Sequence, residues 1–221
     1  MAIVPHTPGR LAEHYAFDIF HTVHLGIGRN FLGSALALLS ERESAGNVDE
    51  RFNAITEKYL TWCAATSHPP ITHKITKDLI SWPATTDYPS GPWYKAELTT
   101  TLLEWFESLD GNFDADDEVM SLAMEACKSL NSFVRLLFRS GAWLSAEDGG
   151  LAAQFACRFL RRYSQLASWA LRAAIMDPAA EAALPTSYSA YLMEGFPSSQ
   201  EIFEPGLLLD TDIRGLYRQA L

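Results

Sequence analysis

The sequence predicts an all-α protein, a single domain of about five or six helices over residues 1–221. Apolar residues recur every three or four positions over several long segments, which is the spacing of one face of an α-helix. No two segments alternate apolar and polar residues in the way that paired strands do. Hydrophobic residues make up 48% of the chain and charged residues 20%, so the chain can bury a sizeable core.

The order of the expected elements follows from this spacing. Residues 1–13 contain Pro5 and Pro8 and are expected to form a loop. Residues 14–20 admit two interpretations. In a strand their side chains alternate between two faces, whereas in a helix His14, Asp18 and His21 line one side. Further helices are expected at about 22–41, 47–66, 95–108, 116–139 and 146–176, with a closing helix at about 211–221.

Capping residues mark several of these helix ends. Asn47 or Asp49 is expected to cap the helix that ends near Thr66. Carboxylates of the acidic turn before residue 116 favour the start of the next long helix. Ser145 with Asp148 predicts a cap for the last long helix.

The core is predicted from the apolar stripes of these helices. Trp105 and Phe133 are expected to lie in the core, and the apolar side chains from Val119 to Phe138 are expected to be buried. Glycines interrupt the first stripe, which predicts close packing against another element at each of them. They are Gly26, Gly28 and Gly33. Core packing is also expected for the tryptophans, which are Trp62, Trp82, Trp93, Trp105, Trp143 and Trp169.

The connection over residues 67–94 is unusually long for a compact domain. It is rich in proline, and one short helical candidate occurs at about 77–82. Because it also carries Trp82 and Trp93, we expect it to wrap against the core.

Charge argues against binding to nucleic acid by this chain alone. The net charge is −10, from 27 acidic and 17 basic residues, whereas phosphate contacts need clustered Lys and Arg. The densest basic cluster, Arg158, Arg161 and Arg162, is expected to be the solvated edge of a helix.

Cysteine usage and the apolar runs bear on localisation. The odd number of cysteines, three, and their wide spacing predict buried thiols in a reducing compartment. The start of the chain lacks the basic and apolar regions of a signal peptide, and the run Phe31–Leu39 is too short to span a membrane. We therefore expect an intracellular protein, nuclear or cytoplasmic.

The strongest chemical candidate is a metal site near the start of the chain. His14, Asp18, His21 and His24 fall within an arc of about 120° on a helix, where nitrogen and oxygen ligands could hold a divalent ion such as zinc, iron or magnesium. Alternatively, these side chains hydrogen-bond to the backbone where a helix begins. A second cluster could add ligands, and it consists of Cys63, His68 and His73.

Other catalytic motifs are missing from the sequence. It contains no G-x-S-x-G segment, and no cysteine lies in a recognisable catalytic context. The segment GIGRNFLG is one residue longer than the dinucleotide-binding G-x-G-x-x-G motif and begins inside a helical pattern. Nucleotide binding is therefore not expected.

Two segments resemble those of CACTA-type transposases, which are cut-and-paste enzymes of eukaryotes with an RNase H-like fold. Asp18-x-x-His21, followed by His24-Leu25-Gly26 and a helix, resembles their D-x-x-H motif, although Ile19 and Phe20 replace the usual middle pair. The segment from Gly91 to Glu97 is similar to their G-x-x-K-A-x-E segment. The order of FDIFHTVHLGIGR, WPATTDYPSGPWYKAELTT and RFLRRYSQLAS is most similar to transposon-derived proteins of dinoflagellate algae.

The resemblance implies that Asp18 and Glu97 match acidic positions of the family. A two-metal transposase site needs carboxylates on adjacent strands, and no strand is expected before Asp18. The sequence therefore predicts a non-catalytic helical module, either a transposase-derived remnant or a repurposed protein-interaction domain that binds another protein or a second copy of itself. One alternative is a metal-binding protein or metal-dependent enzyme that uses the histidine cluster. Another is a fragment, a transposase subdomain that works with a missing N-terminal partner.

Overall fold

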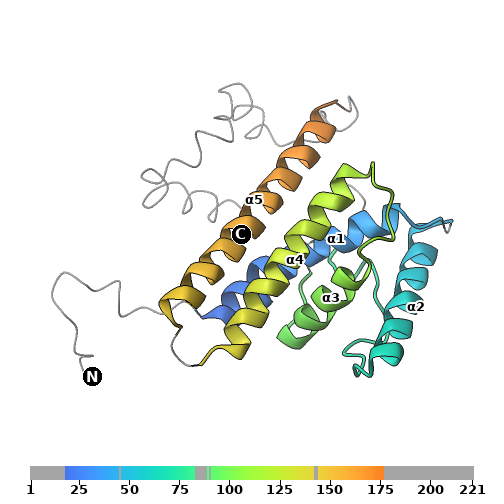
Figure 1. Cartoon of the computed structure of the whole chain (residues 1–221). Coiled ribbons are helices and arrows are strands. Elements are labelled where there is room, and N and C mark those ends of the chain that lie inside the picture. The colour runs from blue at the N-terminus through green and yellow to red at the C-terminus, as the bar shows by residue number, and fades with distance from the viewer. Residues whose placement is uncertain (1–17, 45, 83–88, 90, 142–143, 177–221) are drawn as a thin grey trace, which may run out of the picture. The chain divides into compact units, whose positions relative to one another are not determined.

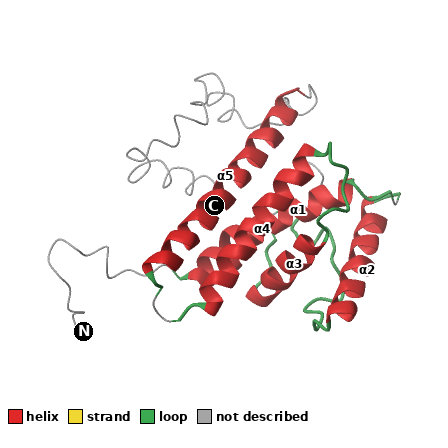
Figure 2. Cartoon of the chain, in the orientation of Figure 1, coloured by secondary structure: helices red, strands yellow, loops and turns green. Residues whose placement is uncertain are grey.

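The computed structural model describes residues 18–44, 46–82, 89, 91–141 and 144–176. They contain a π-helical turn and five α-helices (Figure 1): η2 (Phe20–Ile27), α1 (Gly28–Glu41), α2 (Val48–Thr66), α3 (Ala96–Ser108), α4 (Glu118–Arg139) and α5 (Ala146–Met176). No strand occurs within these ranges (Figure 2), which confirms the all-α prediction. None of the described helices is long and apolar enough to cross a membrane.

The chain divides into two compact units, residues 1–169 and 170–221. In the second unit, the described residues are 170–176, which form the C-terminal end of α5. The single domain over residues 1–221 stays a prediction. The expected loop at 1–13 and the closing helix near 211–221 lie outside the described residues.

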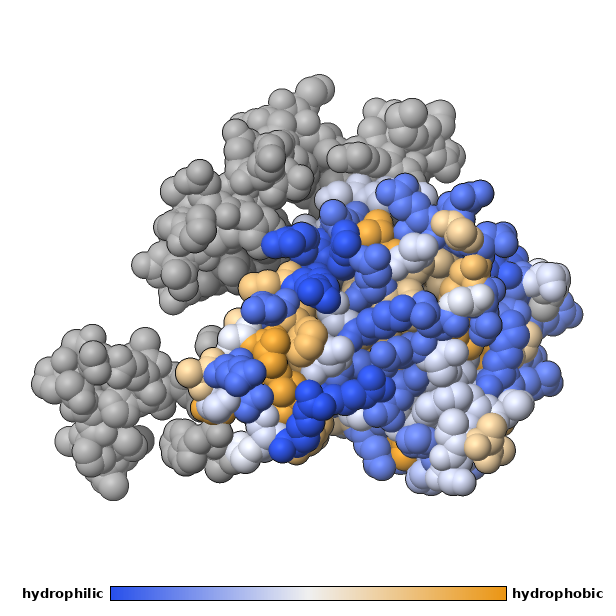
Figure 3. All heavy atoms as spheres, in the orientation of Figure 1, coloured by the Kyte–Doolittle hydropathy of each residue, from blue (hydrophilic) through white to orange (hydrophobic). Residues whose placement is uncertain are grey.

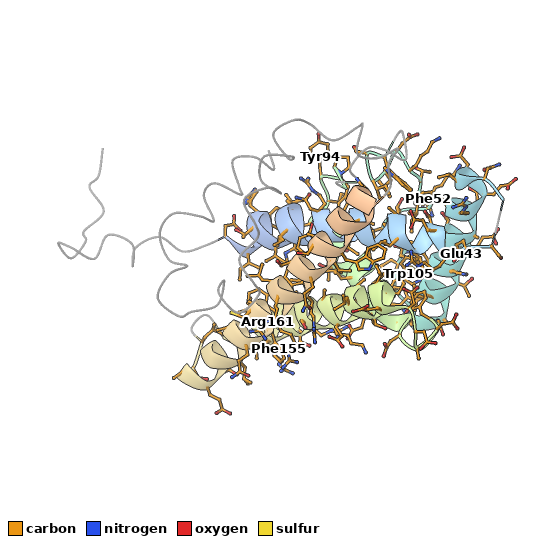
Figure 4. All side chains as sticks on the ribbon, turned by 90° about the horizontal axis from the view of Figure 1, so that it is seen from above. Glu43, Phe52, Tyr94, Trp105, Phe155 and Arg161 are labelled. Carbon is orange, nitrogen blue, oxygen red and sulfur yellow. The ribbon has the colours of Figure 1, made fainter. Side chains whose placement is uncertain are left out.

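Helix α1 is the element that the other helices of the first unit share. α2, α3 and α4 all pack against it, and α3 and α4 also lie side by side (Figure 1). α5 reaches α1 through aromatic rings: the Phe31 ring centroid lies 5.6 Å from that of Phe159 and 5.7 Å from that of Tyr163. Trp105 is fully buried among these helices, as predicted (Figure 4).

The predicted caps hold two of the helix starts. Asn47 and Glu50 form a reciprocal capping box at α2, with hydrogen bonds of 3.0 Å and 2.9 Å. At α5, the Ser145 hydroxyl accepts the backbone N–H of Asp148 at 3.0 Å. Such caps satisfy N–H groups that have no partner inside the helix.

The cap of α4 also joins it to α1. The Asp117 carboxylate accepts the backbone N–H of Met120 and two guanidinium N–H groups of Arg42, at 3.0 Å and 3.2 Å. The Arg42 contact lowers the pKa of Asp117. One carboxylate therefore starts α4 and fixes the end of α1 beside it.

The connection after α2 lies against the core, as predicted. Ile75 and Ile80 are fully buried, and the backbone N–H of Ile75 donates to the Thr56 hydroxyl at 3.0 Å. Tyr59 accepts the backbone N–H of Ile71 at 3.2 Å. Residues 77–81 form a turn, so the helix expected at 77–82 is absent from this described segment.

Two predicted core residues lie on the surface instead. Phe138 is 73% exposed and Trp169 is 42% exposed, although each continues an apolar stripe. A stripe gives the face of a helix but not how far the neighbouring helices extend along it, so residues near a helix end can remain uncovered. Phe133 is half-buried against the core, and Trp143 lies outside the described residues.

A buried chain of hydrogen bonds connects three separate segments of the fold. The Thr99 hydroxyl in α3 donates to the backbone carbonyl of His24 at 2.6 Å and accepts the indole N–H of Trp93 at 2.8 Å. Thr99 is fully buried, and the Arg29 guanidinium donates to the Trp93 carbonyl at 3.2 Å. Because a buried donor or acceptor without a partner is costly, these bonds hold η2, α3 and the segment before α3 in register.

Replacing the central hydroxyl should destabilise the fold. Thr99→Val keeps the shape of the side chain but leaves the His24 carbonyl and the Trp93 indole without this partner. The free energy of unfolding should fall by about 2–4 kcal/mol in urea denaturation. Thr101→Val is the matched control in the same helix, because the Thr101 hydroxyl bonds only to the Glu97 carbonyl one turn back. If the free energy of unfolding falls equally in Thr99→Val and Thr101→Val, the proposed role of Thr99 is contradicted.

Candidate functional site

The site begins at Asp18, one residue before Ile19, the N-cap of η2, and the Asp18 side chain bonds to the first N–H groups of this turn. Its carboxylate accepts the backbone N–H of Phe20 at 2.8 Å, and its backbone carbonyl accepts that of Thr22, also at 2.8 Å. The His21 ring Nδ1 donates to the same carboxylate at 2.5 Å. Hydrogen bonding from His21 and from the backbone lowers the pKa of Asp18. Among the described residues of 14–20, the helical interpretation is therefore the correct one.

The η2 turn owes its shape to two glycines. At Gly26 the backbone leaves the helical region, with φ −113° and ψ −117°. A Cβ atom there would come within 2.8 Å of the His21 carbonyl oxygen. At Gly28 a Cβ would lie 2.7 Å from the Val23 carbonyl oxygen and 3.4 Å from side-chain carbons of Thr99 and Leu130. The predicted close packing against other elements is thus confirmed at Gly28.

His24 lies buried at the centre of the site. Only 4% of its surface is exposed, and its ring stands between two phenylalanines. The ring centroids of Phe20 and Phe138 lie 6.5 Å and 5.9 Å from that of His24. Burial lowers the pKa of His24, and its Nδ1 has no hydrogen-bond partner among the described residues. Burial therefore favours the neutral form of the His24 ring, although a hydrogen bond with the Ile19 backbone opposes this effect.

We name Phe20, His24 and Phe138 the end patch. Phe20 is 49% exposed and Phe138 is 73% exposed, so two large aromatic side chains face solvent on either side of a buried ring. Figure 3 shows further apolar side chains, in orange, near the end of the first unit where α4 ends and α5 begins. Sequence analysis missed this patch because it assigned Phe138 to the core. The spacing of Phe20 and His24, four residues apart on one side of a helix, was the available signal.

The predicted metal ligands are only partly brought together. Asp18 and His21 are in direct contact, whereas His24 packs between aromatic rings. In the part of the chain that the structure describes, no group of three or more His, Cys, Asp or Glu side chains could hold a metal ion. His14 lies outside the described residues, so the four-ligand site stays a prediction.

The second predicted ligand cluster is wrong. Cys63 is buried in the core, and His73 is exposed. His68 stacks on Trp62, with ring centroids 4.8 Å apart. These three side chains do not form a metal-binding group. They are close in sequence, but the helix end near Thr66 and the turn after it separate them.

Glu97 lies exposed in the first turn of α3. Its backbone carbonyl accepts the Thr101 hydroxyl at 3.0 Å. Neither its carboxylate nor that of Asp18 belongs to a group of three or more potential metal ligands in the described ranges. The described residues therefore supply these two carboxylates without the strands that a two-metal transposase site requires.

A separate open groove lies between α2 and α3, with a volume of about 510 Å³. Trp62, Trp105 and Leu109 supply its apolar walls, and Glu57 and Lys58 are the charged residues that line it. This groove is distinct from the end patch, since the two share no residue.

Comparison with known proteins adds no relative. No family model, curated protein sequence or solved structure matches this chain. The resemblance to CACTA-type transposases therefore rests on the quoted motifs and stays a prediction.

The role of Asp18 at the start of η2 can be tested by substitution. Asp18→Ala removes the acceptor of the first N–H groups of η2 and should lower the melting temperature in metal-free buffer. Asp18→Asn is the matched control, because an asparagine oxygen can accept the same N–H groups, and it should melt close to wild type. An unchanged melting curve for Asp18→Ala would count against this role.

The buried histidine predicts a pH dependence of stability. Because the pKa of His24 is lower in the folded protein, the unfolded chain binds this proton more readily as the pH falls from about 7 to about 5. The free energy of unfolding should therefore decrease as the pH falls over this range. This decrease should be smaller in the His24→Phe variant. The measurement is urea unfolding at several pH values. If the free energy of unfolding changes equally with pH in His24→Phe and wild type, His24 is not the source of the pH dependence.

Proposed function

We propose that this chain is a non-catalytic helical module that acts through protein contacts, with the end patch as a contact surface. The observation that carries the proposal is the exposure of Phe138, 73%, beside that of Phe20, 49%. Clustered exposed aromatic side chains are typical of binding surfaces, and aromatic residues are enriched among the anchors of protein interfaces.

The contacts that hold His24 in place within the end patch favour the same function. The His24 ring lies against the rings of both phenylalanines, and its backbone carbonyl is bonded to buried Thr99. A surface that is held in place before binding loses less conformational entropy when a partner binds. The order of the motifs around Asp18 and Gly91 supports the further proposal that the module descends from a CACTA-type transposase.

The test is a photo-crosslinking experiment. A benzophenone-bearing amino acid at position 138 should crosslink to a specific protein in extracts of the source cells, to be identified by mass spectrometry. The same amino acid at Ser121, an exposed position elsewhere on α4, is the matched control and should not give this product. Adding Phe20→Ser to the position-138 probe should reduce its yield by about tenfold, because an anchoring ring is lost.

Two results would contradict the proposal. One is the same set of crosslinked products from positions 138 and 121. The other is a product at position 138 whose yield does not change with Phe20→Ser, since the two rings flank His24 and should be covered by the same partner.

A second candidate function is metal binding, favoured by the contact between Asp18 and His21. Both side chains are exposed, and they offer one oxygen and one nitrogen ligand next to each other. The test is elemental analysis of the purified chain by inductively coupled plasma mass spectrometry, before and after dialysis against chelator. Near-stoichiometric zinc or iron that is lost in His21→Ala would support this function. Equal metal content in wild type and His21→Ala would argue against it.

A further inference from the structure

Helix α5 is long but buries little of its surface. It spans Ala146–Met176, and its buried side chains among residues 146–169 are Ala152, Phe159 and Leu166. These three repeat every seven residues, so they form one narrow stripe that contacts the rest of the first unit. A helix with so narrow a buried stripe has flanks available to a partner.

One flank of α5 carries a second stripe with the spacing of a helix–helix seam. Its positions are separated alternately by four and three residues, which keeps them on one side of a helix. We name this stripe the α5 seam, and it consists of Leu151, Phe155, Arg158, Arg162, Gln165 and Trp169. Leu151 is 37% exposed and Phe155 is half-buried, so the N-terminal half of the seam presents apolar surface.

Charge is distributed along α5 in a self-complementary way. Glu147 and Asp148 lie in its first turn, and exposed Arg158 follows about three turns later. Arg162, one turn further on, is paired with Glu125 of α4 at 2.6 Å, so Arg158 is the basic group that faces outward. Leu151 and Phe155 lie between the acidic and the basic group. If two copies of α5 pair antiparallel, the acidic turn of each copy lies opposite the basic residues of the other.

We propose that the α5 seam is a contact between two copies of this chain, related by a two-fold axis with the two helices antiparallel. The proposal goes beyond the end patch and rests on different residues. With the axis passing near residue 153, Leu151 of one copy packs against Phe155 of the other. Glu147 and Asp148 then face Arg158 of the second copy. The axis repeats each contact, as in an isologous dimer.

The charge pattern of α5 is what points to a second copy as the occupant. The chain as a whole carries a net charge of −10, so two copies repel each other over most of their surfaces. The α5 seam places Arg158 opposite Glu147 and Asp148 of the second copy, so opposite charges meet at this contact. Apolar side chains at the centre with charged residues around them also match the usual anatomy of an interface.

Sedimentation equilibrium on the full chain tests the proposal. Wild type should show a mass of twice 24.6 kDa at high concentration. Leu151→Glu should weaken the dimer by about tenfold or more, because it introduces charge at the apolar centre. Glu147→Arg and Arg158→Glu should each weaken it as well, since each places like charges opposite one another.

Mixing the two charge variants identifies the antiparallel arrangement. In a heterodimer of the Glu147→Arg chain with the Arg158→Glu chain, both charge contacts are restored, so an equimolar mixture should recover the dimer. Phe138→Ser in the end patch is the control and should dimerise like wild type. Circular dichroism melting should show that all variants fold, since Glu147, Leu151 and Arg158 are exposed.

Two outcomes would overturn the proposal. One is a wild-type mass of 24.6 kDa at every concentration up to about 100 µM, far above the level that a micromolar dimer requires. The other is a dimer that the mixture of charge variants does not restore. Failure of the crosslinking at position 138 would concern only the end patch, so the two proposals fail separately.

Discussion

Two distant parts of the sequence meet at the hydroxyl of Thr99. It bonds to the carbonyl of His24 in η2, and the indole of Trp93 bonds to it from the segment before α3. All of this takes place in a fully buried position, where water cannot replace a lost bond. The arrangement of η2 against α3 therefore depends on a polar contact and not on apolar packing alone.

The position of the end patch follows from this contact. Gly28 lets the end of η2 lie close to Leu130 and Thr99, because a Cβ there would be 3.4 Å from a side-chain carbon of each. With the backbone of His24 held, its ring lies between Phe20 and Phe138. The two exposed rings are consequently supported from below, which is the property that the proposed function requires.

Much of the fold could be predicted from local sequence signals, because helix periodicity and caps act over a few residues. Asn47 and Ser145 begin the helices that their positions predicted. The exposure of Phe138 and Trp169 could not be predicted in this way, because it depends on where the neighbouring helices end.

The candidate site was less predictable than the fold. The contact between Asp18 and His21 follows from their spacing, three residues apart at a helix start. The burial of His24 and the role of Thr99 depend on a contact between residues 75 positions apart, which no local pattern specifies.

Hydrogen exchange of the Trp93 indole proton tests the central claim most directly. Its resonance can be assigned by comparison with Trp93→Phe. If the bond to Thr99 holds η2 and α3 together, the proton should exchange only through global unfolding, as slowly as the most protected amides of α1. Exchange through local opening, much faster than that of the α1 amides, would show that this contact is not what holds the segments in register.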